Sequence, residues 1–380
     1  MILRSHLELE WPLGISLRRG TGNDLGAALY VPGSTVRGAL AEAYLEAHAR
    51  QADAGFEDLF LKGRVRFGDL RINLADPWPL SARVCRDLPE EHRPADLLIA
   101  AAAHEAIAPE CAACKAKRHF PGGFLKLRSG PPPVYCSEPI ESRRVAHVQI
   151  QPELLRAQDT QFHTARILER DQVFEGSIWV DDGMAKELET LIGQERTLYL
   201  GRGRTRGLGR ARLSTWPVRP RSTEEIESAL KTLNGVAGCT SELSGKVVFI
   251  CTLLSRTILY DRWLLARPVL DTSDIAKGLD SGECKYECKA HFARMCEVAG
   301  WHANAQLPKT GAAALEAGSA FLFATKERVA DAHAEYRRLA GILAATELLG
   351  VGERCEEGFG EAVFCHPFHN ELHMEQVEVA

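Results

Sequence analysis

The first residues of the chain alternate between apolar and polar side chains, which is typical of a β-strand with one buried face. Every second residue from Leu3 to Trp11 would face one way, and the charged residues between them the other. After a glycine turn, apolar residues recur at helical spacing from Val36 to Ala47, and Ser34 or Thr35 stands where an N-cap is expected. Another strand is expected at 65–70. The opening therefore predicts a strand, a loop, a helix and a strand.

Similar patterns recur in two blocks further along the chain. The first block predicts strands at 145–150, 173–180, 197–200 and 211–216 and a helix at 184–194. The second block predicts strands at 246–254, 320–325 and 361–365 and helices at 284–299 and 329–349. Both halves end as helix, glycine-rich loop and strand, and no GxGxxG fingerprint opens a helix. We therefore expect an α+β fold of tandem, related ferredoxin-like domains rather than a doubly wound Rossmann sheet.

The length of the chain, 380 residues, suits two domains. We expect an N-terminal domain at 1–216 and a C-terminal domain at 246–380, joined by a polar linker at 217–245. Clustered prolines and four cysteines interrupt the first domain at 76–136. Such a stretch is typical of an insertion rather than of part of the sheet.

The bulk composition is that of an ordinary globular protein, with 45% hydrophobic and 26% charged residues. The formal net charge is −5, so a nucleic acid could be bound only by local basic patches. No apolar run approaches the roughly eighteen residues of a membrane span, and the charged, alternating start does not resemble a signal peptide. Eleven irregularly spaced cysteines fit a reducing compartment better than a disulfide framework. We therefore expect a cytoplasmic protein with no membrane partner.

The strongest local signal is a loop in which glycines alternate with arginines. Its members are Gly201, Arg202, Gly203, Arg204, Arg206, Gly207, Gly209 and Arg210, with Arg212 just beyond. The glycines permit positive φ angles and close approach of a ligand to the main chain, and exposed N–H groups in such loops bind anions. Arginine also suits bidentate contacts with phosphate. The loop predicts contact with RNA; the alternative is a flexible hairpin whose arginines pair with surface carboxylates.

A second candidate for anion binding lies at the start of the first predicted helix. Arg37 is in the first turn, where a cation opposes the helix dipole. An anion bound at Gly33 and Ser34 would reverse this effect and explain both the glycine turn and the charge. The alternative is a salt bridge from Arg37 to Asp24 or Glu42.

Other charged segments differ in sign. Basic residues gather between Lys115 and Arg128, and Arg143 and Arg144 follow; these segments predict either contact with an RNA backbone or a solvated basic face. The second glycine loop, at 350–360, instead carries three glutamates against one arginine. It should repel phosphate, so its glycines are expected to serve tight packing or a protein contact.

Four cysteines of the insertion, Cys85, Cys111, Cys114 and Cys136, predict a structural zinc site in a zinc-ribbon-like insertion. The Cys111-x2-Cys114 knuckle supplies two thiolates from one tight turn. A loop-rich segment with little core gains most stability from a bound metal. The alternative is a set of unrelated cytosolic thiols.

The chain offers little for catalysis, because HExxH, a nucleophile elbow and Gly-Gly-Asp-Asp are all missing from the sequence. Three histidines, His119, His147 and His163, lie near the basic region and are the candidates for activating a ribose hydroxyl. A lone histidine is more often structural. We therefore expect a binding protein, with a metal-independent endoribonuclease as the alternative.

Several of these segments resemble CRISPR-associated RAMP proteins. Residues 30–40, YVPGSTVRGAL, look like the IPGSxxRGAL opening of that superfamily, and residues 200–210 look like its glycine-rich loop. Four further segments, at 59–70, 79–85, 111–114 and 350–360, resemble in the same order the RAMP subunit of type III-D systems, the Csx-ten type. The resemblance runs across nearly the whole chain.

The resemblance implies two ferredoxin-like, RNA-recognition-motif folds and a non-catalytic subunit that caps the 5′ handle of the guide RNA (crRNA). The implied partners are RAMP backbone subunits and the large polymerase-like subunit of a type III effector complex. Arg37 and the loop at 201–210 would contact the handle. The family usually has a basic, glycine-rich hairpin after the double arginine, whereas residues 147–161 carry few basic side chains. A backbone subunit that coats the spacer is the alternative role.

Overall fold

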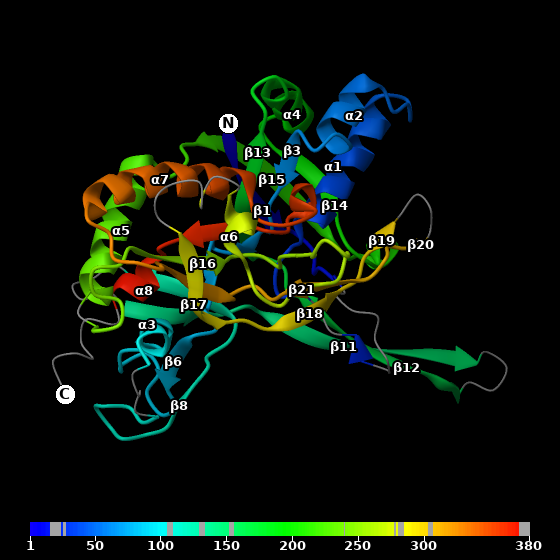
Figure 1. Ribbon diagram of the computed structural model, residues 1–380. Coiled ribbons are helices and arrows are strands. Elements are labelled where there is room, and N and C mark those ends of the chain that lie inside the picture. Colours follow the sequence, from blue (N-terminus) through cyan, green and yellow to red (C-terminus); the bar gives the residue numbers. More distant parts are fainter. Residues whose placement is uncertain are drawn as a thin grey trace.

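The computed structural model describes residues 1–15, 24–25, 28–104, 109–128, 134–151, 156–238, 240–276, 279, 285–302 and 307–371. It is a mixed α/β protein whose two largest sheets are antiparallel (Figure 1). Among these residues no helix has the length and apolar character needed to cross a membrane.

The first large sheet is built from the N-terminal part of the chain. Its strands are β1 (Ile2–Leu9), β3 (Val65–Phe67), β4 (Arg71–Ile72), β13 (Val173–Val180), β14 (Arg196–Tyr199) and β15 (Arg210–Val218). They lie in the order β14-β15-β1-β13-β3, with β4 also beside β13. The helices of this part are α1 (Gly33–Ala47), α2 (Ala54–Phe60) and α4 (Ala185–Ile192). Leu3, Leu7 and Leu9 are buried as the alternation predicted, because they face the core that these helices cover.

The second large sheet is built from the C-terminal part. Its strands are β16 (Val248–Leu253), β17 (Tyr286–Phe292), β22 (Ala320–Thr325) and β23 (Ala362–Phe364), in the order β17-β22-β16-β23. The helices are α5 (Thr223–Ala237), α6 (Thr272–Ile275), α7 (Ala332–Leu349) and α8 (Pro367–Glu371). The two sheets share a strand order. If β1, β3, β13 and β15 are numbered one to four in the first sheet, and β16, β17, β22 and β23 one to four in the second, both have the order 4-1-3-2.

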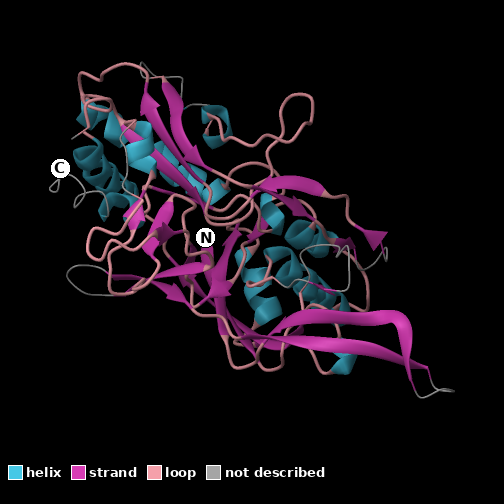
Figure 2. Cartoon of the chain, turned by 90° about the horizontal axis from the view of Figure 1, so that it is seen from below, coloured by secondary structure: helices cyan, strands magenta, loops and turns pink. Residues whose placement is uncertain are grey.

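Each sheet also carries a hairpin between its second and third strands. In the first, β11 (Ser142–Gln151) and β12 (Arg156–Leu168) project from the body, with β2 (Asp24–Leu25) beside β12 (Figures 1 and 2). In the second, the hairpin consists of β18 (Met295–Val298), β19 (Trp301–His302), β20 (Leu307–Pro308) and β21 (Ala312–Leu315).

The stretch predicted as an insertion forms small sheets of its own, separate from the large ones. Its elements are β5 (Asp76–Pro77), β6 (Ala82–Cys85), β7 (Ala95–Asp96), α3 (Leu98–Ala102), β8 (Arg118–His119), β9 (Phe124–Arg128) and β10 (Val134–Glu138). It packs against the C-terminal part of the chain. Leu98 and Ile99 belong to the core of the second sheet, and Trp78 packs against Phe368 of α8.

The structure corrects two predicted elements. Residues 285–299 are strands β17 and β18 rather than part of a helix, and a bulge between Cys288 and Ala290 interrupts the alternation there. The predicted linker, 217–245, contains helix α5, which buries Ile226 and Leu230 in the second core. A capping box between Ser222 and Glu225 starts this helix. Most of that stretch is therefore part of the second domain.

Candidate nucleic-acid interface

The first glycine loop, residues 200–210, joins β14 to β15 through a 3-10 turn, η1 (Arg204–Arg206). Gly203 and Gly207 bracket this turn at φ angles of 74° and 76°. A Cβ atom on Gly209 would lie 1.9 Å from the carbonyl oxygen of Leu200. The loop therefore has a shape set by packing and positive φ angles, in contrast to the flexible hairpin of the alternative interpretation.

The arginines of this loop divide into two groups. Arg202, Arg204 and Arg206 are exposed, and none has an ion-pair partner within the described ranges. Arg210 pairs with Glu10 at 2.7 Å, and Arg212 pairs with Glu8 at 2.5 Å. The pairing with surface carboxylates that the alternative interpretation expected occurs at the exit of the loop. The arginines at the tip have no such partner among the described residues, and their contact with RNA stays a prediction.

The loop lies beside the base of the projecting hairpin. A short extended segment joins them, since the N–H of Leu13 donates to the carbonyl of Leu168 at 2.9 Å and the N–H of Arg202 donates to Gly14 at 2.9 Å. Arg144 and Arg166 are directly opposite each other on the hairpin, and both are exposed.

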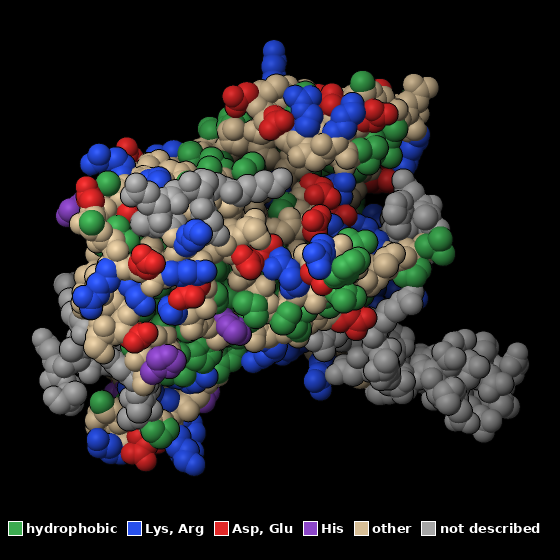
Figure 3. Space-filling model, in the orientation of Figure 1, with side chains coloured by type: hydrophobic (Ala, Val, Ile, Leu, Met, Phe, Trp, Pro, Cys, Tyr) green, Lys and Arg blue, Asp and Glu red, His purple; other side chains and the backbone are tan. Residues whose placement is uncertain are grey.

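Other predicted basic positions are engaged or only partly described. Arg143 pairs with Glu169 at 3.1 Å across the base of the hairpin. The backbones of His147 and His163 are opposite partners in the hairpin, but their side chains lie outside the described residues. In the view of Figure 3, basic and acidic side chains are intermixed over the body, in keeping with the net charge of −5. The basic surface is thus local.

The predicted anion site at the start of α1 is filled by the protein itself. The N–H of Gly33 donates to Asp69 Oδ1 at 2.9 Å, and burial raises the pKa of Asp69 to about 7. Arg37 donates to the carbonyl of Phe60 and pairs with Glu357 at 3.5 Å, rather than with Asp24 or Glu42.

The residue before α1 is Pro32, and no side chain caps the helix, so neither Ser34 nor Thr35 has the predicted role. Ser34 is half-buried. Gly33 and Arg37 therefore contribute to the contact between the two halves of the chain, and the structure does not bring Gly33, Ser34 and Arg37 to the exposed arginines.

The second glycine loop, residues 350–360, repeats the main-chain hydrogen bonds of the first. The N–H of Val351 donates to Gly360 at 2.9 Å, as Leu200 does to Gly209 at 2.8 Å. The N–H of Glu353 donates to Ile258 at 3.0 Å, as Arg202 does to Gly14 at 2.9 Å. A 3-10 turn, η3 (Cys355–Glu357), again lies between two left-handed residues. The sequence similarity between the halves thus reflects a repeated structure.

In contrast to the first loop, the second is packed against the other half of the chain. Glu357 is bound by three cations, Arg37 at 3.5 Å, Lys309 at 2.8 Å and Arg354 at 2.5 Å. Although burial opposes it, the hydrogen bonds from Lys309 and Arg354 hold the pKa of Glu357 below its usual range. The structure thus contains the tight packing predicted for the glycines of this loop, and the alternative, contact with another protein, stays a prediction.

The insertion brings four potential metal ligands together: Cys85, His92, Cys111 and Cys114, whose ligand atoms lie within 4.8 Å of one another. Cys85 Sγ is 3.5 Å from Cys114 Sγ and 3.4 Å from His92 Nδ1. Donors around a single tetrahedral zinc ion lie roughly 3.5–3.8 Å apart, so the set has the right size.

Backbone N–H groups also point at the sulfur atoms of this cluster. Those of Ala113 and Cys114 donate to Cys111 Sγ, and that of Leu88 donates to Cys85 Sγ. The Leu88 hydrogen bond, with His92 adding to it, lowers the pKa of the Cys85 thiol to about 6. An environment that favours thiolate suits a metal ligand.

One predicted ligand is corrected, because His92 occupies the fourth place in the cluster instead of Cys136. Cys136 is buried in β10, and its Sγ faces the carbonyl of Lys126 at 3.6 Å. The short segment between Cys85 and His92 turns back, so that the imidazole of His92 lies close to the thiols of Cys111 and Cys114. The Cys85-x6-His92 spacing was the available signal in the sequence.

Sequence reasoning also missed a group with the geometry of a catalytic triad. His369 Nδ1 is 2.6 Å from Asp96 Oδ2, and His369 Nε2 is 2.9 Å from Thr252 Oγ1. These side chains are 0%, 1% and 1% exposed, respectively, so no substrate reaches the hydroxyl. The group instead ties α8 to the insertion and to the central strand β16.

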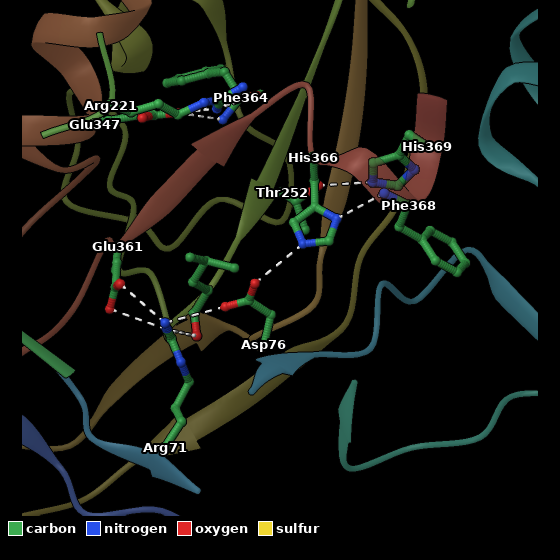
Figure 4. Close-up of polar contacts among 11 residues, drawn as sticks. Arg71, Asp76, Arg221, Thr252, Glu347, Glu361, Phe364, His366, Phe368 and His369 are labelled. Atoms are coloured by element: carbon green, nitrogen blue, oxygen red, sulfur yellow. Dashed lines mark hydrogen bonds and ion pairs between the residues drawn. The ribbon is translucent and has the colours of Figure 1, made fainter. Parts of the chain in front are cut away.

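Figure 4 shows a neighbouring buried network of the same kind. Arg71, only 4% exposed, pairs with Asp76 at 3.2 Å and with Glu361 at 3.3 Å, and His366 lies 3.2 Å from Asp76. These contacts join the first sheet, the insertion and the end of the chain. Buried charges are tolerated here because they are paired with one another.

No protein-family model and no curated protein matches the chain. Similar folds occur among solved structures. A chain of the cryo-EM structure of the Type III-B Cmr-beta bound to cognate target RNA and AMPPnP, state 1, matches with 13% identity over 90% of this chain and 94% of that one, at a TM-score of 0.44. The crystal structure of Cmr4 matches with 11% identity over 58% of this chain and 100% of that one, at a TM-score of 0.28.

Proposed function

We propose that this chain is a RAMP-superfamily subunit of a type III CRISPR effector complex that binds crRNA without cleaving it. The observation that carries the proposal is the first glycine loop, which presents Arg202, Arg204 and Arg206 from a preformed turn beside Arg144 and Arg166. Phosphates would be bound there by guanidinium groups and by close approach to the main chain. The repeated 4-1-3-2 strand order supports a tandem ferredoxin-like fold, as the RAMP-like sequence segments imply.

The finer role that we propose is a cap on the 5′ handle, next to a RAMP backbone subunit and the large polymerase-like subunit. Only one of the two repeated glycine loops is exposed and basic. One such loop suits a single RNA segment for each chain. A subunit that coats the spacer would instead bind RNA of any sequence and oligomerise along it.

We also propose that the chain does not cleave the RNA that it binds. The Asp96, His369 and Thr252 group is fully buried, and His119 is an exposed, isolated histidine on β8. The alternative, an endoribonuclease, is tested by incubating the protein with labelled repeat RNA without metal ions. Discrete products that disappear in the His119→Ala variant would favour the enzyme.

RNA binding is tested with a double variant, Arg204→Ala with Arg206→Ala. If each arginine contacts one phosphate, the slope of log K against log salt should fall in magnitude by about 1.4. The affinity should fall roughly tenfold or more, since charge-assisted hydrogen bonds are lost. The matched control is Arg50→Ala with Arg219→Ala, two exposed arginines whose partners are surface glutamates. Equal slopes in the two double variants would remove the loop from the RNA interface.

We also propose that Cys85, His92, Cys111 and Cys114 hold a structural zinc ion, which would staple the insertion. Elemental analysis should find about one zinc ion per chain. His92→Ala and Cys85→Ser should lower the zinc content and the unfolding temperature. Cys136→Ser should leave the zinc content unchanged, and a loss of zinc in that variant would contradict the ligand set.

A further inference from the structure

The second half of the chain has an exposed turn beside its acidic glycine loop. Ile258 pairs with Glu353 of that loop, and the chain then turns back on itself, with Tyr260 paired to Ala266. We call residues 260–266 the apolar tip. Ile258 stands where Gly14 stands in the first half, since both residues make the same bridge to a glycine-rich loop.

The apolar tip is a rigid turn held by Asp261. The Asp261 carboxylate accepts from the N–H groups of Trp263 at 2.8 Å and Leu265 at 2.9 Å. The Asp261 N–H donates to the carbonyl of Leu265 at 2.9 Å. Leu264, at the apex, has a φ angle of 61°, a strained conformation for a branched side chain. Strain of this kind persists where the surrounding structure fixes it, and it is concentrated at binding sites.

The turn presents its apolar side chains to solvent. Trp263, Leu264 and Leu265 are 70%, 78% and 64% exposed. Arg262 lies over the Trp263 ring at 5.0 Å and has no carboxylate partner among the described residues. Three adjacent large apolar residues on one ordered turn form a patch of the kind that marks an interaction site, and tryptophan and arginine are the residues most often central to interfaces.

We propose that the apolar tip inserts into an apolar groove, rimmed by a carboxylate, on a neighbouring protein subunit. Charge complementarity indicates this occupant: Arg262 lacks an acidic partner within the chain, and a carboxylate at the rim of the groove would supply it. RNA fits less well: Trp263 offers one stacking face, but Leu264 and Leu265 offer none, and Glu353 and Glu356 of the adjacent loop repel phosphate. The proposal rests on the proposed function only in placing that neighbour in the same ribonucleoprotein complex.

The test compares complexes purified through this chain from cells that express all of its partner subunits. The double variant Leu264→Asp with Leu265→Asp should lose one stoichiometric protein component and keep its bound RNA. The matched control is Leu61→Asp with Leu349→Asp, which changes two leucines of similar exposure, 63% and 75%, outside the tip. Its complex should keep every component. An unchanged composition in the tip variant would overturn the proposal.

Two single variants separate docking from folding. Leu264→Gly should raise the unfolding temperature, because glycine adopts the positive φ angle without strain, while it lowers the yield of the same component. Arg262→Glu should weaken retention of that component at least tenfold, and reversing the charge of the rim carboxylate should restore it. Loss of RNA instead of protein, or a changed self-association of this chain in sedimentation, would identify RNA or a second copy as the occupant and overturn the proposal.

The outcome is independent of the RNA experiment. If the tip variants bind RNA normally but lose the protein component, both proposals stand. If the Arg204 and Arg206 variant keeps its salt dependence while the tip variants lose the component, the RNA site is wrong and the docking site remains.

Discussion

The two glycine-rich loops share a backbone but differ in charge and in exposure to solvent. Judged by the shared hydrogen bonds, Arg202, Arg204 and Arg206 of the first loop stand where Glu353, Cys355 and Glu357 stand in the second. The first trio is exposed to solvent. In the second loop, Glu357 is held by three cations, one of which, Arg37, comes from the other half of the chain.

The comparison shows that the geometry of the loops and their charge are set by different residues. Glycines hold both loops in shape, because a Cβ atom at Gly209 or Gly360 would lie 1.9 Å or 2.0 Å from a carbonyl oxygen. The basic loop presents arginines to solvent, whereas the acidic loop contributes a carboxylate to the contact between the halves.

The largest expected effect tests the shared backbone. Gly209→Ala and Gly360→Ala should each cost about 4 kcal/mol or more of unfolding free energy, since both a clash and a positive φ angle oppose the methyl group. Gly207→Ala, with a φ angle of 76° and no neighbouring atom within 4 Å, should cost only about 1 kcal/mol. Urea unfolding measures all three. Equal, small losses would mean that the two loops do not need their shared geometry.

The next effect tests the role of Glu357. Arg37→Glu and Glu357→Arg should each cost about 2–3 kcal/mol, because the side chains are only 19% and 12% exposed and each change brings like charges together there. The double variant should recover part of this loss, measured as a coupling energy in a double-mutant cycle. Full recovery is not expected, since Lys309 and Arg354 also face Glu357. Strictly additive losses would show that this pair does not couple the halves.

A smaller effect is the pH dependence of stability that Asp69 should cause at the same contact. Burial raises the pKa of Asp69 to about 7, well above that of an unfolded chain, so the folded state takes up a proton that the unfolded state does not. Stability should therefore increase by about 1 kcal/mol as the pH falls from about 7.5 to about 6. Asp69→Asn should remove this dependence while still accepting from Gly33. Parallel pH profiles for the two proteins would contradict the assignment.

The smallest expected effect tests whether charge alone makes an RNA site. Glu353→Arg with Glu356→Arg gives the second loop a basic sequence but leaves it packed against the first half of the chain. RNA affinity should change by less than about threefold, because binding also needs an exposed turn. A gain comparable to the loss in the Arg204 and Arg206 variant would show that accessibility is not the difference between the loops.

Much of the fold could be predicted because its signals are local. The strands at 173–180 and 320–325 coincide with β13 and β22, and the repeated ending of helix, glycine loop and strand occurs in both halves. The prediction of a helix at 284–299 was wrong because the bulge after Cys288 interrupts the alternation of side chains that would have indicated a strand. The prediction of a linker at 217–245 was also wrong. The signal for helix α5 was present in the sequence, because Ile226, Leu230 and Leu233 follow helical spacing after a capping box.

The candidate site was predictable only in part. The glycine and arginine content located the exposed loop, and the CxxC knuckle located two of the metal ligands. The partner of Arg37 could not be found, because Glu357 lies near the other end of the chain and only tertiary packing brings the two together. Which arginines stay unpaired depends on strand register, as when β1 places Glu8 and Glu10 beside Arg212 and Arg210.

The packing of the insertion against the C-terminal half has a consequence for synthesis on the ribosome. Leu98 and Ile99 leave the exit tunnel long before β16, β22 and α7 exist, yet their burial depends on those elements. Until those elements have been synthesised, α3 has no partner for its apolar face, and contacts this distant in sequence form late. Chains that terminate before α7 would therefore expose the apolar face of this helix.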